Sequence, residues 1–167
     1  MTDRVVGPLR DARLPLFEGL RSFQRAAAAV HDDAPDALPV IDEALEYLHG
    51  TFIPLSRAEE FTLYPAVDGV IGSVGATGIM VAQHGTIGEM VADLDRVVTA
   101  ARPQSEVAAY APYLLPLLYG LYAAVRMHLE AEDSVYLGLL DEFLSESQVG
   151  MIVDNLRRVS VGSAAPS

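Results

Sequence analysis

The sequence contains no cysteine among its 167 residues. This absence excludes disulfides, iron–sulfur clusters, thiolate chemistry and cysteine-ligated zinc. Any bound metal must therefore be held by His, Asp, Glu or Tyr side chains. Tryptophan is also absent and aromatic residues make up only 7% of the chain, whereas hydrophobic residues make up 51%. A core of Leu, Val, Ile and Ala is typical of helices packed on helices, so we expect an all-α bundle.

Positive charge and long uncharged apolar runs are also scarce. The chain has 11 basic and 23 acidic residues, with a net charge of −12, which disfavours a phosphate backbone or an anionic membrane surface as a partner. The nearest approach to a membrane span, residues 107–125, is interrupted by Pro112, Pro116 and Gly120. Residues 1–13 carry charges and a proline where a secretory signal has an apolar core. We therefore expect a cytoplasmic protein with no nucleic-acid or membrane partner.

The length fits one domain, and the apolar residues recur at helical spacing. This pattern predicts four long helices and a short fifth one, at about 10 or 15 to 30, 35–64, 77–101, 105–144 and 145–159. We expect residues 1–8 to form a flexible leader, 9–159 the bundle and 160–167 a disordered tail. Pro54 should bend the second helix. The glycine-rich segment 68–78 should be a loop, because it lacks the lysine and spacing of a phosphate-binding loop.

Polar residues interrupt these apolar stripes and are candidate ligands. His128 and Glu132 lie four residues apart on one face of the fourth helix, where they can converge on one metal ion or on a close pair. A buried carboxylate needs a cation, a hydrogen-bond network or a proton. Glu59 interrupts the second helix, His84 the third, and His31 lies at the end of the first. These five side chains either bind a metal or form a buried polar network.

Three segments resemble motifs of the hemerythrin-like (HHE cation-binding) family. Residues 59–65, EEFTLYP, resemble E-E-x-x-L-[FY]-P, and residues 83–87, QHGTI, resemble E-H-x-x-I. Residues 128–137, HLEAEDSVYL, resemble H-x-x-x-E-x-x-[VL]-[FY]-[LF]. The motifs follow the family order, and the resemblance spans about residues 10–144. It implies an up-down four-helix bundle, here with a short C-terminal fifth helix.

The resemblance also implies a non-haem di-iron centre with terminal histidines and two bridging carboxylates. Glu59 and Glu132 would be the bridges, and His84 and His128 terminal ligands. His31 matches a first-helix histidine of one subset of the family.

The chain departs from the family pattern at two places. Leu55 stands where the family has a second-helix histidine, four residues before the bridging glutamate. The early first-helix histidine is also missing, since residues 9–18 offer as polar side chains only Arg10, Asp11, Arg13 and Glu18. The remaining ligands suffice for one metal, or for two metals completed by water or by a phenolate such as Tyr119 or Tyr122.

The resemblance implies that the protein binds one or two iron ions and serves to bind, sense or detoxify O2, nitric oxide or peroxide. A catalase-like or oxidase activity would follow if it is an enzyme, and no catalytic residue is assigned. One alternative is a metal-free interaction or regulatory bundle. Another is a mononuclear zinc or iron site at His84, His128 and Glu132, with Glu59 or water. The apolar side chains of the fifth helix either cover the bundle end or form a homodimer contact.

Overall fold

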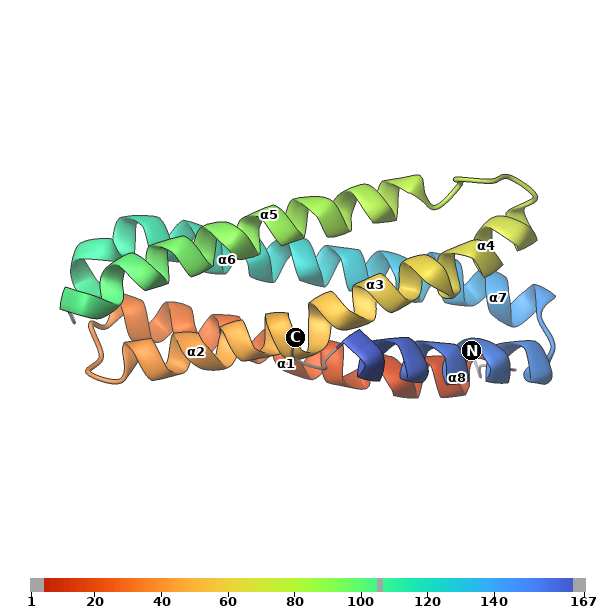
Figure 1. Cartoon of the computed structure of the whole chain (residues 1–167), viewed down its shortest axis with the longest axis horizontal. Helices are drawn as coiled ribbons and strands as arrows, with labels where there is room; N and C mark the ends of the chain where they lie inside the picture. The colour runs from red at the N-terminus through yellow and green to blue at the C-terminus, as the bar shows by residue number, and fades with distance from the viewer. Residues whose placement is uncertain (1–4, 105–106, 164–167) are drawn as a thin grey trace.

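The computed structural model describes residues 5–104 and 107–163, which are mostly helical and contain no strand. Figure 1 shows the helices lying side by side in an elongated bundle. The predicted all-α bundle is confirmed. Its elements are α1 (Gly7–His31), α2 (Ala37–Tyr47), η1 (Leu48–Phe52), α3 (Ile53–Phe61), α4 (Leu63–Ile71), α5 (Gly78–Ala101), η2 (Arg102–Gln104), α6 (Val107–Ala131), η3 (Glu132–Tyr136), α7 (Leu137–Phe143) and α8 (Glu146–Ser163).

The apolar core has two parts. The larger part is formed by side chains of α1, α2, η1, α5 and α6, including Phe23, Ile41, Leu94 and Leu118. The smaller part lies at the other end of the bundle and joins α4, α7 and α8 to the start of α1. Leucine, valine, isoleucine and alanine dominate both parts, as the composition predicted. Between the two core regions lies a layer of buried polar side chains, which we call the polar layer: Arg13, Glu59, His84, His128 and Glu132.

The C-terminal helix α8 covers one end of the bundle. It packs against α1 and α3, which lie beside it in Figure 1. Its apolar side chains Val149, Ile152, Val153 and Leu156 are all buried within this chain. Burial of a continuous apolar stripe is the main force that holds such a helix in place. Of the two roles foreseen for this stripe, the structure therefore has it covering the bundle end.

The ends of the helical region extend further than the sequence indicated. Helix α1 begins at Gly7, inside the predicted leader 1–8, and α8 runs to Ser163, inside the predicted tail 160–167. The backbone N–H groups of Val5 and Val6 both donate to Asp141 Oδ1, at 2.6 and 3.1 Å. This carboxylate satisfies donors that precede the first helical turn. The rest of both predictions, residues 1–4 and 164–167, lies outside the described residues.

The predicted second helix continues beyond the expected end at Tyr64. A break at Thr62, whose φ is −127°, separates α3 from α4, and α4 runs to Ile71 before ending at the left-handed Gly72. The break places Pro65 in the first turn of α4, where a missing N–H costs no helical hydrogen bond. The predicted loop is therefore shorter, and Asp68 accepts from the backbone of Gly75 and Thr77 within it.

Two π-helical turns flank the polar layer. The first, η1, precedes Pro54, so the expected bend takes the form of one widened turn followed by α3. The second, η3, begins at Glu132. Single π-turns within α-helices occur frequently at functional sites, because they shift side chains relative to the regular helical face. Both widened turns lie next to the residues that the sequence singled out as ligands.

Helix α6 is long and largely apolar. It contains Pro112 and Pro116, and both are exposed. The stretch Val107–Phe143 is long and apolar enough to cross a membrane by length and composition alone. A core helix of a bundle meets the same criterion.

Candidate metal centre

Four of the five predicted ligands converge in the middle of the bundle. Glu59 comes from α3, His84 from α5, His128 from α6 and Glu132 from the start of η3. One ligand atom of each lies within 4.8 Å of those of the others, and all four residues are buried. His84 Nε2 lies 2.9 Å from His128 Nε2 and 3.8 Å from Glu59 Oε2. His128 Nε2 lies 3.4 Å from Glu132 Oε2. The convergence needs three separate helical segments, because α6 continues directly into η3 and His128 and Glu132 lie one turn apart on it.

The fifth predicted ligand, His31, is not brought to this cluster. It is the last residue of α1 and is exposed. The residue of α1 that reaches the cluster is Arg13, and eighteen residues of α-helix separate the two by about 27 Å. An interior position on α1 and its C-terminal end cannot contribute to the same site.

Arg13 connects the two carboxyl groups of the cluster. Its Nη1 donates to Glu59 Oε1 at 2.8 Å and its Nη2 to Glu132 Oε2 at 2.5 Å. Only 1% of the residue is exposed. Burial alone would lower the pKa of Arg13, but the charges of Glu59 and Glu132 raise it, so the guanidinium stays protonated. The site therefore contains a fixed positive charge of its own.

The sequence contained a signal for Arg13 that went unused. Leu9, Arg13, Leu16 and Leu20 follow one another at helical spacing, and all four are buried. Arg13 therefore interrupts an apolar stripe in the same way as His128 and Glu59. Arg13 is one of the polar residues of 9–18, but it is not a candidate ligand, because a guanidinium cannot coordinate a metal cation.

The two carboxyl groups carry different charges near neutral pH. Burial and the neighbouring charge of Glu132 raise the pKa of Glu59 to about 8, despite the opposing effect of Arg13. Burial also acts to raise the pKa of Glu132, but Arg13, His128 and the hydrogen bond from Tyr64 together lower it. Glu132 is therefore the ionised partner of Arg13. The Arg13–Glu59 contact is mainly a hydrogen bond to a protonated carboxyl group.

The imidazoles are held so that their Nε2 lone pairs face the cluster. His84 Nδ1 lies 2.8 Å from Glu60 Oε1, and His128 Nδ1 lies 3.0 Å from Gln83 Oε1. Each oxygen accepts the Nδ1 hydrogen, which leaves Nε2 without one in the neutral ring. Burial lowers the pKa of His128 to about 4, so this ring is neutral at pH 7. An outer hydrogen bond of this kind orients histidines that bind metals.

The phenol beside the cluster belongs to Tyr64. Its hydroxyl donates to Glu132 Oε1 at 2.6 Å, and the oxygen lies 3.1 Å from His84 Nε2. Burial and the charge of Glu132 raise the pKa of Tyr64, so its hydroxyl keeps the proton. The predicted phenolates do not lie in the cluster: Tyr119 is 57% exposed, and the hydroxyl of Tyr122 accepts from Arg126. Tyr64 orients a carboxylate rather than serving as a charged ligand.

These donor atoms lie close enough together to share a metal cation. Nitrogen and oxygen ligands bind zinc or iron at about 2.0–2.2 Å, which places neighbouring ligand atoms about 3.4 Å apart around a tetrahedral ion. The three distances given above, 2.9, 3.4 and 3.8 Å, are close to that spacing. With both Nδ1 hydrogens and the Tyr64 proton directed elsewhere, the two Nε2 lone pairs face each other with no hydrogen between them. A cation is the group that such an arrangement accepts most readily.

The fold and this cluster define a class: a helical bundle with a buried site of two histidines and two carboxylates suited to a cation. Comparison with known families finds that residues 14–140 match the hemerythrin HHE cation binding domain. The chain therefore belongs to the hemerythrin HHE family. No curated protein and no solved structure matches it. The family match and the ligand cluster together support cation binding at this site.

Proposed function

We propose that the protein binds one non-haem iron ion at Glu59, His84, His128 and Glu132, and that it binds, senses or detoxifies O2, nitric oxide or peroxide. The observation that carries the proposal is the 2.9 Å contact between two Nε2 atoms whose rings donate their hydrogens outward. Two lone pairs at this distance repel each other unless a cation or a proton lies between them.

Arg13 favours one ion over two. The two carboxylates supply at most two negative charges, and the guanidinium already balances one of them. One divalent ion then leaves the buried cluster with a net charge of about +1, and a second would raise it to about +3, which is costly in a dry interior. Leu55 also removes a nitrogen ligand from the second helix. The mononuclear alternative foreseen from the sequence is therefore the form that we propose.

We name iron because the family resemblance implies it. The ligand set alone, two imidazoles and two carboxylates, suits iron, manganese and zinc alike. When bound, iron would supply redox chemistry and an open coordination position for a small ligand. The chain's own residues hold the imidazoles and limit access of water. The ring of Phe52 lies edge-on to both His84 and His128, with centroids 6.2 and 6.0 Å away.

Elemental analysis and an ultraviolet–visible spectrum test this proposal, on protein purified without chelators. We expect about one iron per chain, lost in His84→Ala and in His128→Ala. His49→Ala is the matched control, because His49 is an exposed histidine that pairs with Asp95 outside the cluster. Two metals per chain would refute the single-ion site. No metal after anaerobic loading with ferrous iron would refute metal binding altogether.

The second candidate is a metal-free interaction or regulatory bundle. The two hydrogen bonds from Arg13 to the carboxyl groups are the observation that favours it. The guanidinium satisfies both carboxyl groups without any metal, leaving its Nε as the one buried side-chain nitrogen or oxygen without a hydrogen-bond partner in the described residues. The two candidates differ in their response to a chelator. Metal removal should lower the melting temperature of an iron protein and leave that of a metal-free bundle unchanged.

A further inference from the structure

The exposed side of α6 lacks the charges that normally cover the solvent face of a bundle helix. Residues 107–125 contain no Asp, Glu, Lys, Arg or His, although charged residues make up 20% of the chain. Burial does not account for this composition, because only 22% of the apolar window within Val107–Phe143 is buried. The exposed side of α6 therefore has the composition of a surface that is covered.

The exposed side chains of α6 form one continuous stripe. Steps of three and four residues return to the same face of an α-helix, and the exposed residues at these steps are Pro112, Pro116, Tyr119, Ala123 and Met127. Tyr113 lies beside the stripe and is 64% exposed, and Tyr119 is 57% exposed. We call the stripe together with Tyr113 the α6 face. Tyrosine and methionine are enriched where proteins contact each other.

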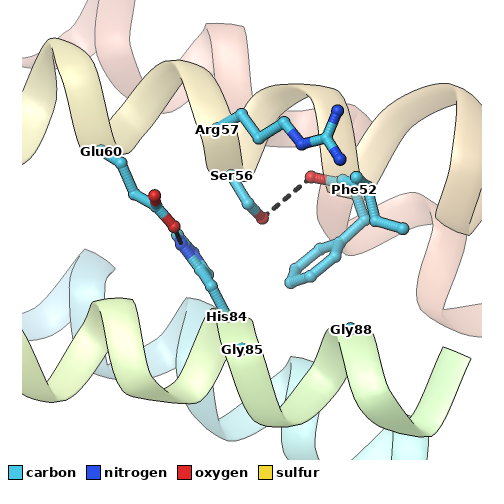
Figure 2. Close-up of a pocket in the computed structure, with 8 residues that line it drawn as sticks. Phe52, Ser56, Arg57, Glu60, His84, Gly85 and Gly88 are labelled. Carbon is cyan, nitrogen blue, oxygen red and sulfur yellow. Dashed lines mark hydrogen bonds and ion pairs between the residues drawn. The ribbon is translucent and has the colours of Figure 1, made fainter. Parts of the chain in front are cut away.

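The uncharged surface continues from α6 toward α5. A cavity of about 260 Å³ between these helices has an uncharged lining, formed by Gln83, Thr86, Ile87, Ala124 and Met127. None of the four candidate ligands lines it. His84 instead reaches from α5 to Glu60 on α3, as Figure 2 shows. The α6 face is therefore separate from the metal centre.

Charge indicates what covers the α6 face. Each chain carries a net charge of −12, so two copies repel each other wherever their charged surfaces meet. At the α6 face they can meet without burying an unpaired charge, which is costly. A basic partner would find no carboxylate to pair with on this stripe, and an anionic membrane surface is repelled by the chain as a whole. The occupant that these charges favour is another uncharged apolar helix face, and a second copy of the chain supplies one.

The area of this surface is sufficient for a stable pair. Helix α6 has 25 residues, which gives a length of about 37 Å. It packs against α1 and α5, and neighbours at the usual distance of about 8–10 Å widen the contact to about 20 Å. Each copy then offers about 740 Å², close to the value of about 800 Å² per partner in a standard interface.

We propose that the α6 faces of two copies pack together in an antiparallel dimer with two-fold symmetry. In such a dimer the same patch meets itself, which a uniformly uncharged patch permits. Antiparallel packing also sets opposite ends of the two helix dipoles side by side. Pro116 lies midway along the helix between Tyr113 and Tyr119, so a two-fold axis at Pro116 gathers four tyrosines around the centre of the interface. Central tyrosines contribute much of the binding energy of protein interfaces.

Sedimentation velocity and light scattering over a concentration series test the dimer on the full chain. We expect twice the mass of one chain at high concentration. Tyr119→Asp places a carboxylate in the interface and should weaken dimerisation at least about tenfold. Phe143→Asp is the matched control, because Phe143 is a 60% exposed aromatic residue of α7 outside the α6 face, and it should leave dimerisation unchanged. Raising the ionic strength from about 0.01 to about 0.15 M shortens the screening length from about 30 to about 8 Å and should tighten the dimer.

The absence of cysteine allows one introduced thiol to locate the two-fold axis. A disulfide requires Cα atoms about 4.4–6.8 Å apart, which only residues close to the axis satisfy. Pro116→Cys should therefore form a disulfide between two chains under mild oxidation. Phe143→Cys, which is also exposed, should not.

Four results would overturn the proposal. One is a parent chain that stays monomeric, and binding of that monomer to neutral phosphatidylcholine vesicles would make a membrane the occupant. The others are a dimer that survives Tyr119→Asp, a dimer that added salt weakens, and a Pro116→Cys variant that cross-links no better than Phe143→Cys. Circular dichroism melting verifies that the variants are folded. These measurements use the mass of the protein rather than its metal content, so their outcome is independent of iron binding.

Discussion

Replacing Arg13 with methionine tests how the buried charges are balanced. Methionine is similar in length and apolar, so it fills much of the space without a positive charge. The substitution removes the Nη1 contact to Glu59 and the Nη2 contact to Glu132. Glu132, which is 0% exposed, would then have no cation beside it, so its charge must remain unbalanced or the carboxyl group must take up a proton. The metal-free variant should therefore be much less stable than the metal-free parent.

Breaking a buried ion pair by removing one partner costs about 3–5 kcal/mol. For a chain of this length, each kcal/mol shifts the melting temperature by about 2–4 °C, so we expect a fall of roughly 6–20 °C. A divalent cation can replace the lost charge, and a ligand at a hundred times its dissociation constant stabilises by about 2.7 kcal/mol. Saturating ferrous or zinc ion should therefore restore a large part of the loss in Arg13→Met.

The assay is thermal and urea unfolding followed by circular dichroism, with and without metal. Arg10→Met is the matched control on the same helix, one turn earlier, because Arg10 pairs with Asp133 while both side chains remain about one-third exposed. An exposed pair of this kind contributes about 0–1 kcal/mol. The reasoning is refuted if Arg13→Met is no more destabilising than Arg10→Met, or if metal gives the Arg13 variant no greater stabilisation than it gives the parent.

Two further predictions concern the carboxyl groups. The pKa of Glu59 is raised to about 8, so metal must displace its proton, and apparent metal affinity should rise about tenfold per pH unit up to about pH 8 and then level off. A competition titration against a chelator measures this, and a flat profile between about pH 6 and 8 would contradict the raised pKa. Tyr64→Phe removes the donor to Glu132 Oε1 and should destabilise the protein by about 1–3 kcal/mol in urea unfolding. An unchanged unfolding midpoint would show that this hydrogen bond contributes nothing.

The stability of the metal-free protein should itself depend on pH through Glu59. A carboxyl group whose pKa is higher in the folded than in the unfolded chain binds its proton more tightly when folded. Its contribution to stability is complete below about pH 4.5 and is lost as the pH rises through about 8. This loss and the gain in metal affinity have the same origin, since both follow the removal of one proton from Glu59.

Local pattern was enough to find most of the site. His84, His128, Glu59 and Glu132 were recognisable because a polar residue within an apolar helical stripe faces the core, and the period of an α-helix fixes which residues share a face. The same argument applied from Leu9 to Leu20 would have found Arg13. His31 was selected as the polar residue at the end of the first helix and was supported by the resemblance, but a position at a helix end gives no reason for burial.

Boundaries and partners were harder to predict. The continuation of the second helix to Ile71 depends on the break at Thr62, which no propensity signals. The acceptors of the Nδ1 hydrogens, Glu60 and Gln83, lie next to ligands in the sequence, but the helix carrying each one is not the helix carrying the histidine it contacts. Such pairs depend on how two helices are rotated against each other.

The sequence by itself determined an all-α bundle, its family and four inward-facing polar residues, because helical periodicity and short motifs are local properties of the chain. Only the tertiary structure decided that Arg13 bridges the two carboxyl groups and that Tyr64 replaces the expected phenols. These features join segments as many as 119 residues apart. The charge balance of a buried site depends on which groups from distant helices come within a few ångströms, and that distance is fixed only when the helices pack.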